Sequence, residues 1–161
     1  MMSTRSGSLD PGLLAYLMQE KKFNFEKIFN LINNESGLLG ISEVTGEMKD
    51  LLYLAGLPVE DETYQPSVRI QGLPDVYKEK SILAIKMYIY GIKKYIGAYA
   101  AILGNVDALI FTGKIGFGSS YIRQEIISGI KNVLGNAKIS AVATNEEKRI
   151  AEEILENLPN K

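Results

Sequence analysis

An arginine near the start of the chain lies among residues that suit an anion. Arg5 stands between the hydroxyls of Thr4 and Ser6 in the stretch STRSGSLDPG. Asp10 and Pro11 predict the start of a helix, because Asp accepts hydrogen bonds from a first helical turn and Pro is tolerated directly after the cap. An arginine beside the positive end of a helix could bind an anion, and a solvated loop arginine is the alternative.

A glycine-rich stretch, GKIGFG at 113–118, follows the apolar run ALIFT at 108–112. A strand, a glycine-rich turn and a helix form an arrangement in which backbone N–H groups can face a nucleotide, because glycine lets the ligand approach. The stretch is not a P-loop, since Lys114 is not followed by Ser or Thr, and its glycine spacing differs from the dinucleotide fingerprint. An ordinary strand-to-helix turn is the alternative.

Two glutamates follow a second strand-like run, ISAVAT at 139–144. Thr144 and Glu147 have the spacing of a capping box, which gives Glu147 a structural role. Glu146 falls in the first helical turn, where the helix dipole stabilises a carboxylate. It could also hold a metal ion, because ligands gather at the carboxyl ends of strands in open α/β sheets.

Composition limits the chemistry that these residues can do. The chain has 161 residues, enough for one domain with a substantial core, and it contains no cysteine and no histidine. Disulfides, thiolate metal sites and histidine bases are therefore excluded. Any reaction must use Arg, Lys, Asp, Glu, hydroxyls, backbone amides or a bound metal.

Charge and hydropathy indicate where the protein works and what it does not bind. The formal net charge of −1 provides no basic surface for nucleic acid or anionic lipid. The longest apolar-looking run, 81–103, carries three lysines and does not have the pattern of a membrane span, and the N-terminus lacks a signal-peptide pattern. We therefore expect a cytoplasmic protein without nucleic acid or membrane partners.

The first half of the chain reads as helices that would position Arg5. Apolar spacing and caps predict three short helices, over 11–20, over 25–33 and from Ser42 to Leu54. From about Asp75 a long helix is expected, and its Gly91 and Gly97 are expected to let another element approach closely. Its apolar stripe consists of Ile82, Ile85, Ile89, Ile92, Ile96, Tyr99 and Leu103.

The second half reads as strand, helix, strand, helix. The order predicts an α/β domain with neighbouring strands and right-handed crossovers. One apolar helix face is expected from Ile122, Ile126, Ile130 and Val133, and another from Ile150, Ile154 and Leu158.

Four blocks of the chain resemble, in the same order, the carboxy-terminal half of acetate kinase. They are TRSGSLDP at 4–11, SGLLGIS at 36–42, KKYIGAYAAILGNVDALIFT at 93–112 and TNEE at 144–147. The resemblance covers nearly the whole chain. It implies the α/β, ribonuclease-H-like ATPase fold of the acetate/sugar kinase–actin superfamily, with 1–161 as one C-terminal domain that carries added helices and an inserted loop at about 57–78.

The resemblance also implies ATP and Mg²⁺ as cofactors and assigns roles to matching residues. Arg5 would stabilise the transferring phosphoryl group, and Glu146 matches a magnesium-associated glutamate. The adenosine pocket corresponds to Glu47, Met48 and Lys49, and the glycine-rich nucleotide loop corresponds to Lys114, Ile115, Gly116, Phe117 and Gly118.

The chain departs from the family in several places. Lys114 replaces a glycine, which could obstruct a ligand or require an unfavourable positive φ. Glu47 and Lys49 stand where the family has Asp and Arg, and lysine cannot stack on a base as guanidinium does. The stretch before ISAVAT is shorter than in the family and lacks a strand pair. The amino-terminal half, with the catalytic histidine and the acetate pocket, has no counterpart in this sequence.

The implied activity is phosphoryl transfer from ATP to acetate, with the chain as the nucleotide-binding half that is inactive without an amino-terminal half on a separate chain. A non-catalytic relic or nucleotide-binding module from a split gene is the alternative, and a propionate kinase or another short-chain carboxylate kinase is a further one. An uncovered surface should be unusually apolar. A homodimer through the 81–103 helix could cover part of it.

Overall fold

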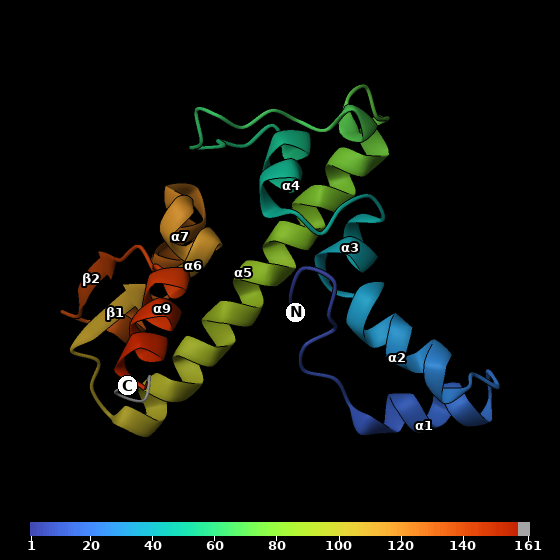
Figure 1. Cartoon of the computed structure of the whole chain (residues 1–161), viewed down its shortest axis with the longest axis horizontal. Helices are drawn as coiled ribbons and strands as arrows, with labels where there is room; N and C mark the ends of the chain where they lie inside the picture. The colour runs from blue at the N-terminus through green and yellow to red at the C-terminus, as the bar shows by residue number, and fades with distance from the viewer. Residues whose placement is uncertain (158–161) are drawn as a thin grey trace.

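One long helix organises the computed structural model, which describes residues 1–157. This helix, α5 (Asp75–Leu103), runs diagonally through the molecule (Figure 1). The first three helices lie on one side of it, the fourth lies beside its N-terminal half, and the sheet lies at its far end. The long helix begins at the residue that the sequence predicts. Before it lie α1 (Pro11–Gln19), α2 (Phe25–Asn34), α3 (Gly37–Ser42), α4 (Met48–Ala55) and the 3-10 turn η1 (Val68–Ile70).

The first two helices begin where their capping residues predict. The carboxylate of Asp10 accepts a hydrogen bond from the Gly12 N–H at 2.7 Å, and the Asn24 side chain accepts one from the Lys27 N–H at 2.9 Å. These bonds satisfy backbone donors that a first helical turn leaves open. Both starts are therefore confirmed.

The helix predicted from Ser42 to Leu54 is wrong in its first part. Ser42 instead ends α3, and its buried hydroxyl donates to the Thr45 carbonyl at 2.8 Å. Glu43 takes a left-handed conformation with φ 60°, which stops the helix. Serine competes for backbone groups in this way at turns, and α4 starts only at Met48.

The C-terminal part contains a parallel pair of strands. In β1 (Ala108–Phe111) and β2 (Lys138–Ala141), Ala108 pairs with Lys138 and Phe111 pairs with Ala141. The predicted order of strand, helix, strand and helix is confirmed. The helices here are α6 (Gly113–Gly118), α7 (Ser120–Ser128), α8 (Lys131–Leu134) and α9 (Glu146–Glu156).

Two local predictions in this part are wrong. The glycine-rich stretch is the short helix α6 rather than an open turn, because Gly113 alone takes the positive φ, 71°, that turns the chain into it. The capping box of Thr144 and Glu147 is also absent: the Asn145 side chain accepts from the Lys148 N–H at 2.9 Å and caps α9 instead.

The core lies between α3, α4, the first half of α5 and α7. On α5 the predicted stripe is buried at Ile85 and Ile89, but Tyr99 and Leu103 are 60% and 68% exposed. Among the described residues, no atom lies within 4 Å of the point that a Cβ would occupy at Gly91 or Gly97, so no described element makes the expected close approach. The largest fully buried apolar side chains are Leu38, Leu51, Leu52, Ile85, Ile122 and Ile126.

The far end of the chain is open by comparison. The accessible surface is 11491 Å², whereas a compact monomer of 17.8 kDa has about 8,000 Å². No described residue of α9 is buried, and Ile150 and Ile154 are both more than half exposed; Leu158, expected on the same face, lies outside the described residues. Within residues 1–157, no helix combines the length and apolar content needed to cross a bilayer.

Candidate functional site

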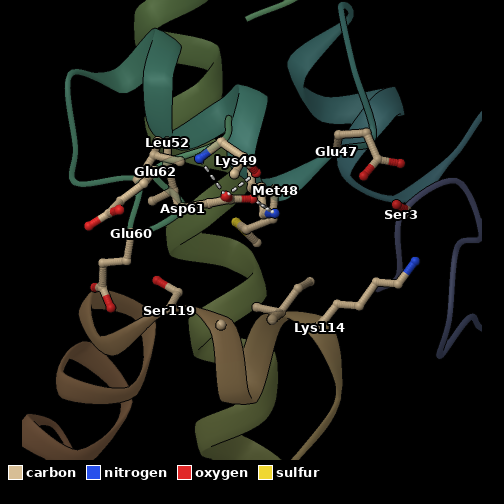
Figure 2. Close-up of a pocket in the computed structure, with 14 residues that line it drawn as sticks. Ser3, Glu47, Met48, Lys49, Leu52, Glu60, Asp61, Glu62, Lys114 and Ser119 are labelled. Carbon is tan, nitrogen blue, oxygen red and sulfur yellow. Dashed lines mark hydrogen bonds and ion pairs between the residues drawn. The ribbon is translucent and has the colours of Figure 1, made fainter. Parts of the chain in front are cut away.

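A cavity of about 960 Å³ lies between α4 on one side and α6 with the start of α7 on the other (Figure 2). It brings together two segments that are more than 60 residues apart in the sequence. Of the residues that the resemblance assigns to nucleotide binding, it is lined by Glu47, Met48, Lys49, Lys114, Ile115 and Gly118.

The α4 side of the cavity follows from the two-sided character of that helix. Met48, Leu51 and Leu52 are buried against α5 and the rest of the core. Lys49, one residue along, therefore points away from the core, and its ammonium forms an ion pair with Asp61 at 2.5 Å. Glu47 precedes the helix, and its backbone N–H donates to the Thr45 hydroxyl at 3.1 Å.

The α6 side holds only part of the predicted glycine-rich loop. Lys114 extends along the cavity toward Ser3 (Figure 2) and does not adopt the positive φ that its replacement of glycine could have required. Gly116 faces Phe111 of β1, whose Cβ lies 3.5 Å from the position of a Cβ at this glycine. Phe117 is 48% exposed and, like Gly116, does not line the cavity.

The end of α6 is fixed by an arginine that sequence reasoning missed. The Arg123 guanidinium donates to the carbonyl oxygens of Gly116 at 3.0 Å and Phe117 at 2.5 Å. These carbonyls belong to the last turn of a helix, where a cation is favourable. Arg123 thereby positions the turn that connects α6 to α7.

Sequence reasoning also missed an acidic stretch, residues 60–63, that lines the cavity. The Glu60 carboxylate caps α7: it accepts from the Ser120 hydroxyl at 2.5 Å and from the N–H groups of Ser120 at 2.9 Å and Tyr121 at 3.1 Å. The Ser120 hydroxyl and N–H are the main cause that lowers the pKa of Glu60. The sequence indicates only an inserted loop here, and its run of carboxylates is the one signal that could have indicated contacts with N–H groups and lysines.

Two further contacts hold the same stretch. The hydrogen bond from Lys49, followed by those from Thr63, lowers the pKa of Asp61 to about 2. The Tyr64 hydroxyl donates to the Asp50 carboxylate at 2.7 Å, and burial, then this bond, raises the pKa of Tyr64. The inserted loop is predicted at about 57–78. In the structure the loop ends at residue 74, because residues 75–78 form the first turn of α5.

Arg5 is exposed and lies outside the lining of the cavity, which its neighbour Ser3 reaches. The backbone around it is tightly fixed. Gly37, with φ 63°, starts α3 where three carbonyl oxygens converge, and a Cβ there would lie 2.3 Å from the Met2 oxygen and 2.7 Å from the Arg5 oxygen. The start of α3 therefore packs directly against the backbone of the segment that carries Arg5.

Glu146 is exposed at the first position of α9, after β2, and does not line the cavity. Its place beyond the carboxyl end of a strand agrees with the sequence analysis. Within residues 1–157, no group of three or more Asp or Glu side chains is placed to hold a metal ion.

Comparison with known proteins identifies the relationship. The sequence profile of the acetokinase family matches residues 1–153. The chain belongs to this family. It is 37% identical to the acetate kinase of Acetivibrio thermocellus over 99% of this chain and 40% of that protein. The acetate kinase of Sulfurovum sp. is 38% identical over 84% of this chain and 29% of its own length.

Solved structures of the acetokinase family confirm the fold. The crystal structure of Porphyromonas gingivalis acetate kinase matches with a TM-score of 0.75 and 30% identity, over 99% of this chain and 41% of that one. A propionate kinase from Francisella tularensis matches with a TM-score of 0.74 and 30% identity, over 94% and 39%. The predicted α/β fold of the acetate/sugar kinase–actin superfamily is therefore confirmed, as is the resemblance to one half of an acetokinase.

The acetokinase relatives are longer both outside and inside the match. The chain spans about two fifths of the length of the first curated relative. That match extends over 180 positions, more than the 161 residues of this chain, so the relative has residues within the match that this chain lacks. Within the described residues, the sheet consists of the two short strands β1 and β2.

Proposed function

We propose that this acetokinase chain is the nucleotide-binding half of an acetate kinase-type phosphotransferase, which transfers a phosphoryl group between ATP and acetate. The observation that carries the proposal is the cavity where residues 47–49 meet residues 114–118. The resemblance assigns each segment to the nucleotide separately, and the fold brings them to opposite sides of a space large enough for a nucleotide.

The side chains around the cavity suit different parts of the nucleotide. Met48 and Ile115 give apolar surface for a base and ribose, while Lys49 and Lys114 supply positive charge for phosphates. Arg5 would contact the transferring phosphoryl group from the neighbouring N-terminal segment, since phosphoryl transfer depends mostly on positioning and charge stabilisation.

A magnesium ion fits this half only together with the nucleotide. Mg²⁺ is commonly held by one or two carboxylates plus substrate phosphates, and Glu146 would be the protein ligand, directly or through water. When bound, the ion would neutralise charge on the phosphate oxygens. The absence of a three-carboxylate group within the described residues supports this shared mode.

Acetate is the proposed acceptor because the curated relatives are named acetate kinases. Propionate is a second candidate, since a propionate kinase structure matches almost as well as an acetate kinase structure. The acceptor pocket and further phosphate contacts would come from residues outside 1–161, and a second copy of the chain could pack on the open part of α5.

The proposal is tested by filling the cavity without disturbing the core. Among the described residues, a Cβ at Gly118 has no neighbour within 4 Å, so Gly118→Val adds methyl groups that project into the space proposed for the nucleotide. We expect this variant to bind MgATP about tenfold more weakly in isothermal titration calorimetry, a difference of about 1.4 kcal/mol. The reason is that the added methyl groups occupy space that the nucleotide would need.

The matched control is Gly97→Val on α5, which also has no neighbour within 4 Å and lies outside the cavity. Its affinity for MgATP should equal that of the parent chain. Absence of MgATP and MgADP binding in the parent chain, and also in a variant that lacks the contacts of Glu60 and Asp61 beside the cavity, would contradict the proposed function and favour a relic or interaction module. Equal affinities for all three proteins would place the nucleotide elsewhere.

A further inference from the structure

One segment lines the cavity in addition to α4 and α6. Residues 57–64, named the strap here, follow the end of α4, line the cavity at residues 59–63 and contact the start of α7 through Glu60 (Figure 2). Leu57 and Val59 are half-buried against the core. The strap lies in the part of the chain that the sequence indicates as an insertion relative to the acetokinase family.

Three side chains fasten the strap, and they attach it to both sides of the cavity. Glu60 caps α7 through Ser120 and Tyr121. Asp61 is paired with Lys49 of α4 at 2.5 Å, and Tyr64 donates to Asp50 of the same helix at 2.7 Å. The strap thus connects α4 and α7 beside the cavity.

The pair between Asp61 and Lys49 has a direct consequence for binding. Lys49 is one of the two lysines that line the cavity, and its ammonium is already engaged by a carboxylate. Glu60 and Asp61 hold this arrangement through contacts with the two sides of the cavity, whereas Glu62 lines the cavity without a described contact of this kind. The closed arrangement therefore opposes the ligand for which the cavity is otherwise suited.

The strap can open without unfolding the chain. The side chains of Lys49 and Asp61 are 50% and 30% exposed, and ion pairs at such positions contribute little to stability. Apolar contacts of the inserted segment are made by Leu57 and Val59, by the buried Ile70, and by Tyr64, whose ring centroid lies 6.3 Å from that of Tyr53 on α4. Residues 60 and 61 between them are held by hydrogen bonds and an ion pair. A segment held mainly by exposed polar contacts opens at low cost compared with a core element.

We propose that the strap is an autoinhibitory cover, and that a magnesium-nucleotide binds only after Glu60 and Asp61 release α7 and Lys49. This inference rests on the proposed nucleotide function of the cavity. The apparent affinity of the parent chain is then the intrinsic affinity reduced by the fraction of molecules whose strap is open. Variants that release the strap should bind more tightly, although they remove contacts.

The test measures MgATP binding by isothermal titration calorimetry for the parent chain, Glu60→Gln, Asp61→Asn and the double variant. The double variant should bind about tenfold more tightly than the parent, and each single variant should lie between them. Glu62→Gln is the matched control. This variant removes one negative charge from the lining of the same cavity, and no described hydrogen bond or ion pair fixes the Glu62 carboxylate. Its affinity for MgATP should therefore differ from that of the parent by less than about twofold.

Amide hydrogen exchange distinguishes opening of the strap from a loss of charge alone. The amides of Ser120 and Tyr121, which donate to Glu60 in the closed strap, should exchange faster in the double variant without ligand. In the parent chain, the amides of the strap itself should exchange faster when MgATP is added. Slower exchange of the strap on MgATP addition, with weaker binding by the variants, would make the strap a nucleotide ligand and overturn the proposal.

The remaining outcomes separate the two proposals. If the parent binds MgATP and the variants bind equally well, the autoinhibitory cover is wrong and the nucleotide function stands. An affinity gain for Glu62→Gln as large as that for the other variants would assign the effect to charge and also overturn the cover. If neither the parent nor the opened double variant binds MgATP, both proposals fail together.

Discussion

The two ends of α5 carry the same kind of apolar stripe but have opposite surroundings. Toward its N-terminus, Ser81, Ala84, Ile85 and Ile89 are buried under α3 and α4. Toward its C-terminus, Tyr99, Ile102 and Leu103 are 60%, 78% and 68% exposed. One helix therefore passes from a packed end to an open end within its 29 residues.

The difference teaches that periodicity identifies a face that can be buried, but not the element that buries it. At the open end, β1 and β2 form a parallel pair with Ile110 and Ile139 exposed. Parallel sheets are normally covered on both faces. Exposed apolar patches of this kind mark surfaces that meet another part of a protein or another chain.

The strongest test of this comparison is to cover the open end. Residues 1–161 alone should form negligible acetyl phosphate from ATP and acetate in a coupled assay. Adding the separately produced amino-terminal part of an acetate kinase should raise turnover toward kinase rates, on the order of 1–100 per second, because the missing positioning groups are then present. Turnover at such rates by residues 1–161 without any addition would break the comparison.

Replacing one leucine at the packed end and one at the open end should give the next largest effect, which is on the free energy of unfolding. Leu51→Ala removes a fully buried side chain at the packed end and should lower the free energy of unfolding by about 3 kcal/mol. Leu103→Ala, where the leucine is 68% exposed, should change it by less than about 0.5 kcal/mol. Urea denaturation measures both. Equal losses would mean that the open end is covered in solution.

The sequence predicted elements best where local chemistry determines them. Asp10 and Asn24 fix helix starts through their own side chains, and Gly56 ends α4 with φ 69°. Ser42 is ambiguous in the sequence because its hydroxyl can either start a helix or close a turn, and the bond to Thr45 that decides between them is formed only in the folded chain.

The candidate site was predictable only in part, for a related reason. The resemblance assigned residues 47–49 and 114–118, and most of these meet at the cavity. The strap contacts of Glu60 and Asp61 could not be predicted, because they join residues 60 and 12 positions apart and form only in the folded chain. Gly116 and Phe117 fall away from the cavity because the stretch is helical, which turns successive residues to different sides.

A pair of glycines sharpens the comparison further. At the packed end, Gly37→Ala should destabilise the chain by about 2 kcal/mol, since φ is 63° and a Cβ would lie 2.3 Å from the Met2 oxygen. At the open end, Gly97→Ala should stabilise it by up to about 1 kcal/mol, because alanine is the better helix former and no atom lies within 4 Å. Thermal unfolding measures both shifts. A loss of stability in Gly97→Ala would indicate a neighbour on the open face.

The smallest expected effect concerns the strap, the weakly held part of the packed end. Asp61 has its pKa lowered from 3.8 to about 2, so its contact with Lys49 stabilises the closed strap above pH 3.8 and is lost as the pH falls from 3.8 toward 2. In a carboxyl ¹³C NMR titration, Asp61 should have a midpoint near 2 in the parent chain. Lys49→Met removes the hydrogen bond that is the main cause and should raise the pKa of Asp61 toward 3.8, whereas Lys80→Met, which breaks the ion pair with Glu43 elsewhere, should leave it unchanged. An Asp61 midpoint that is the same in all three proteins would show that the strap is not fastened to α4 through Lys49.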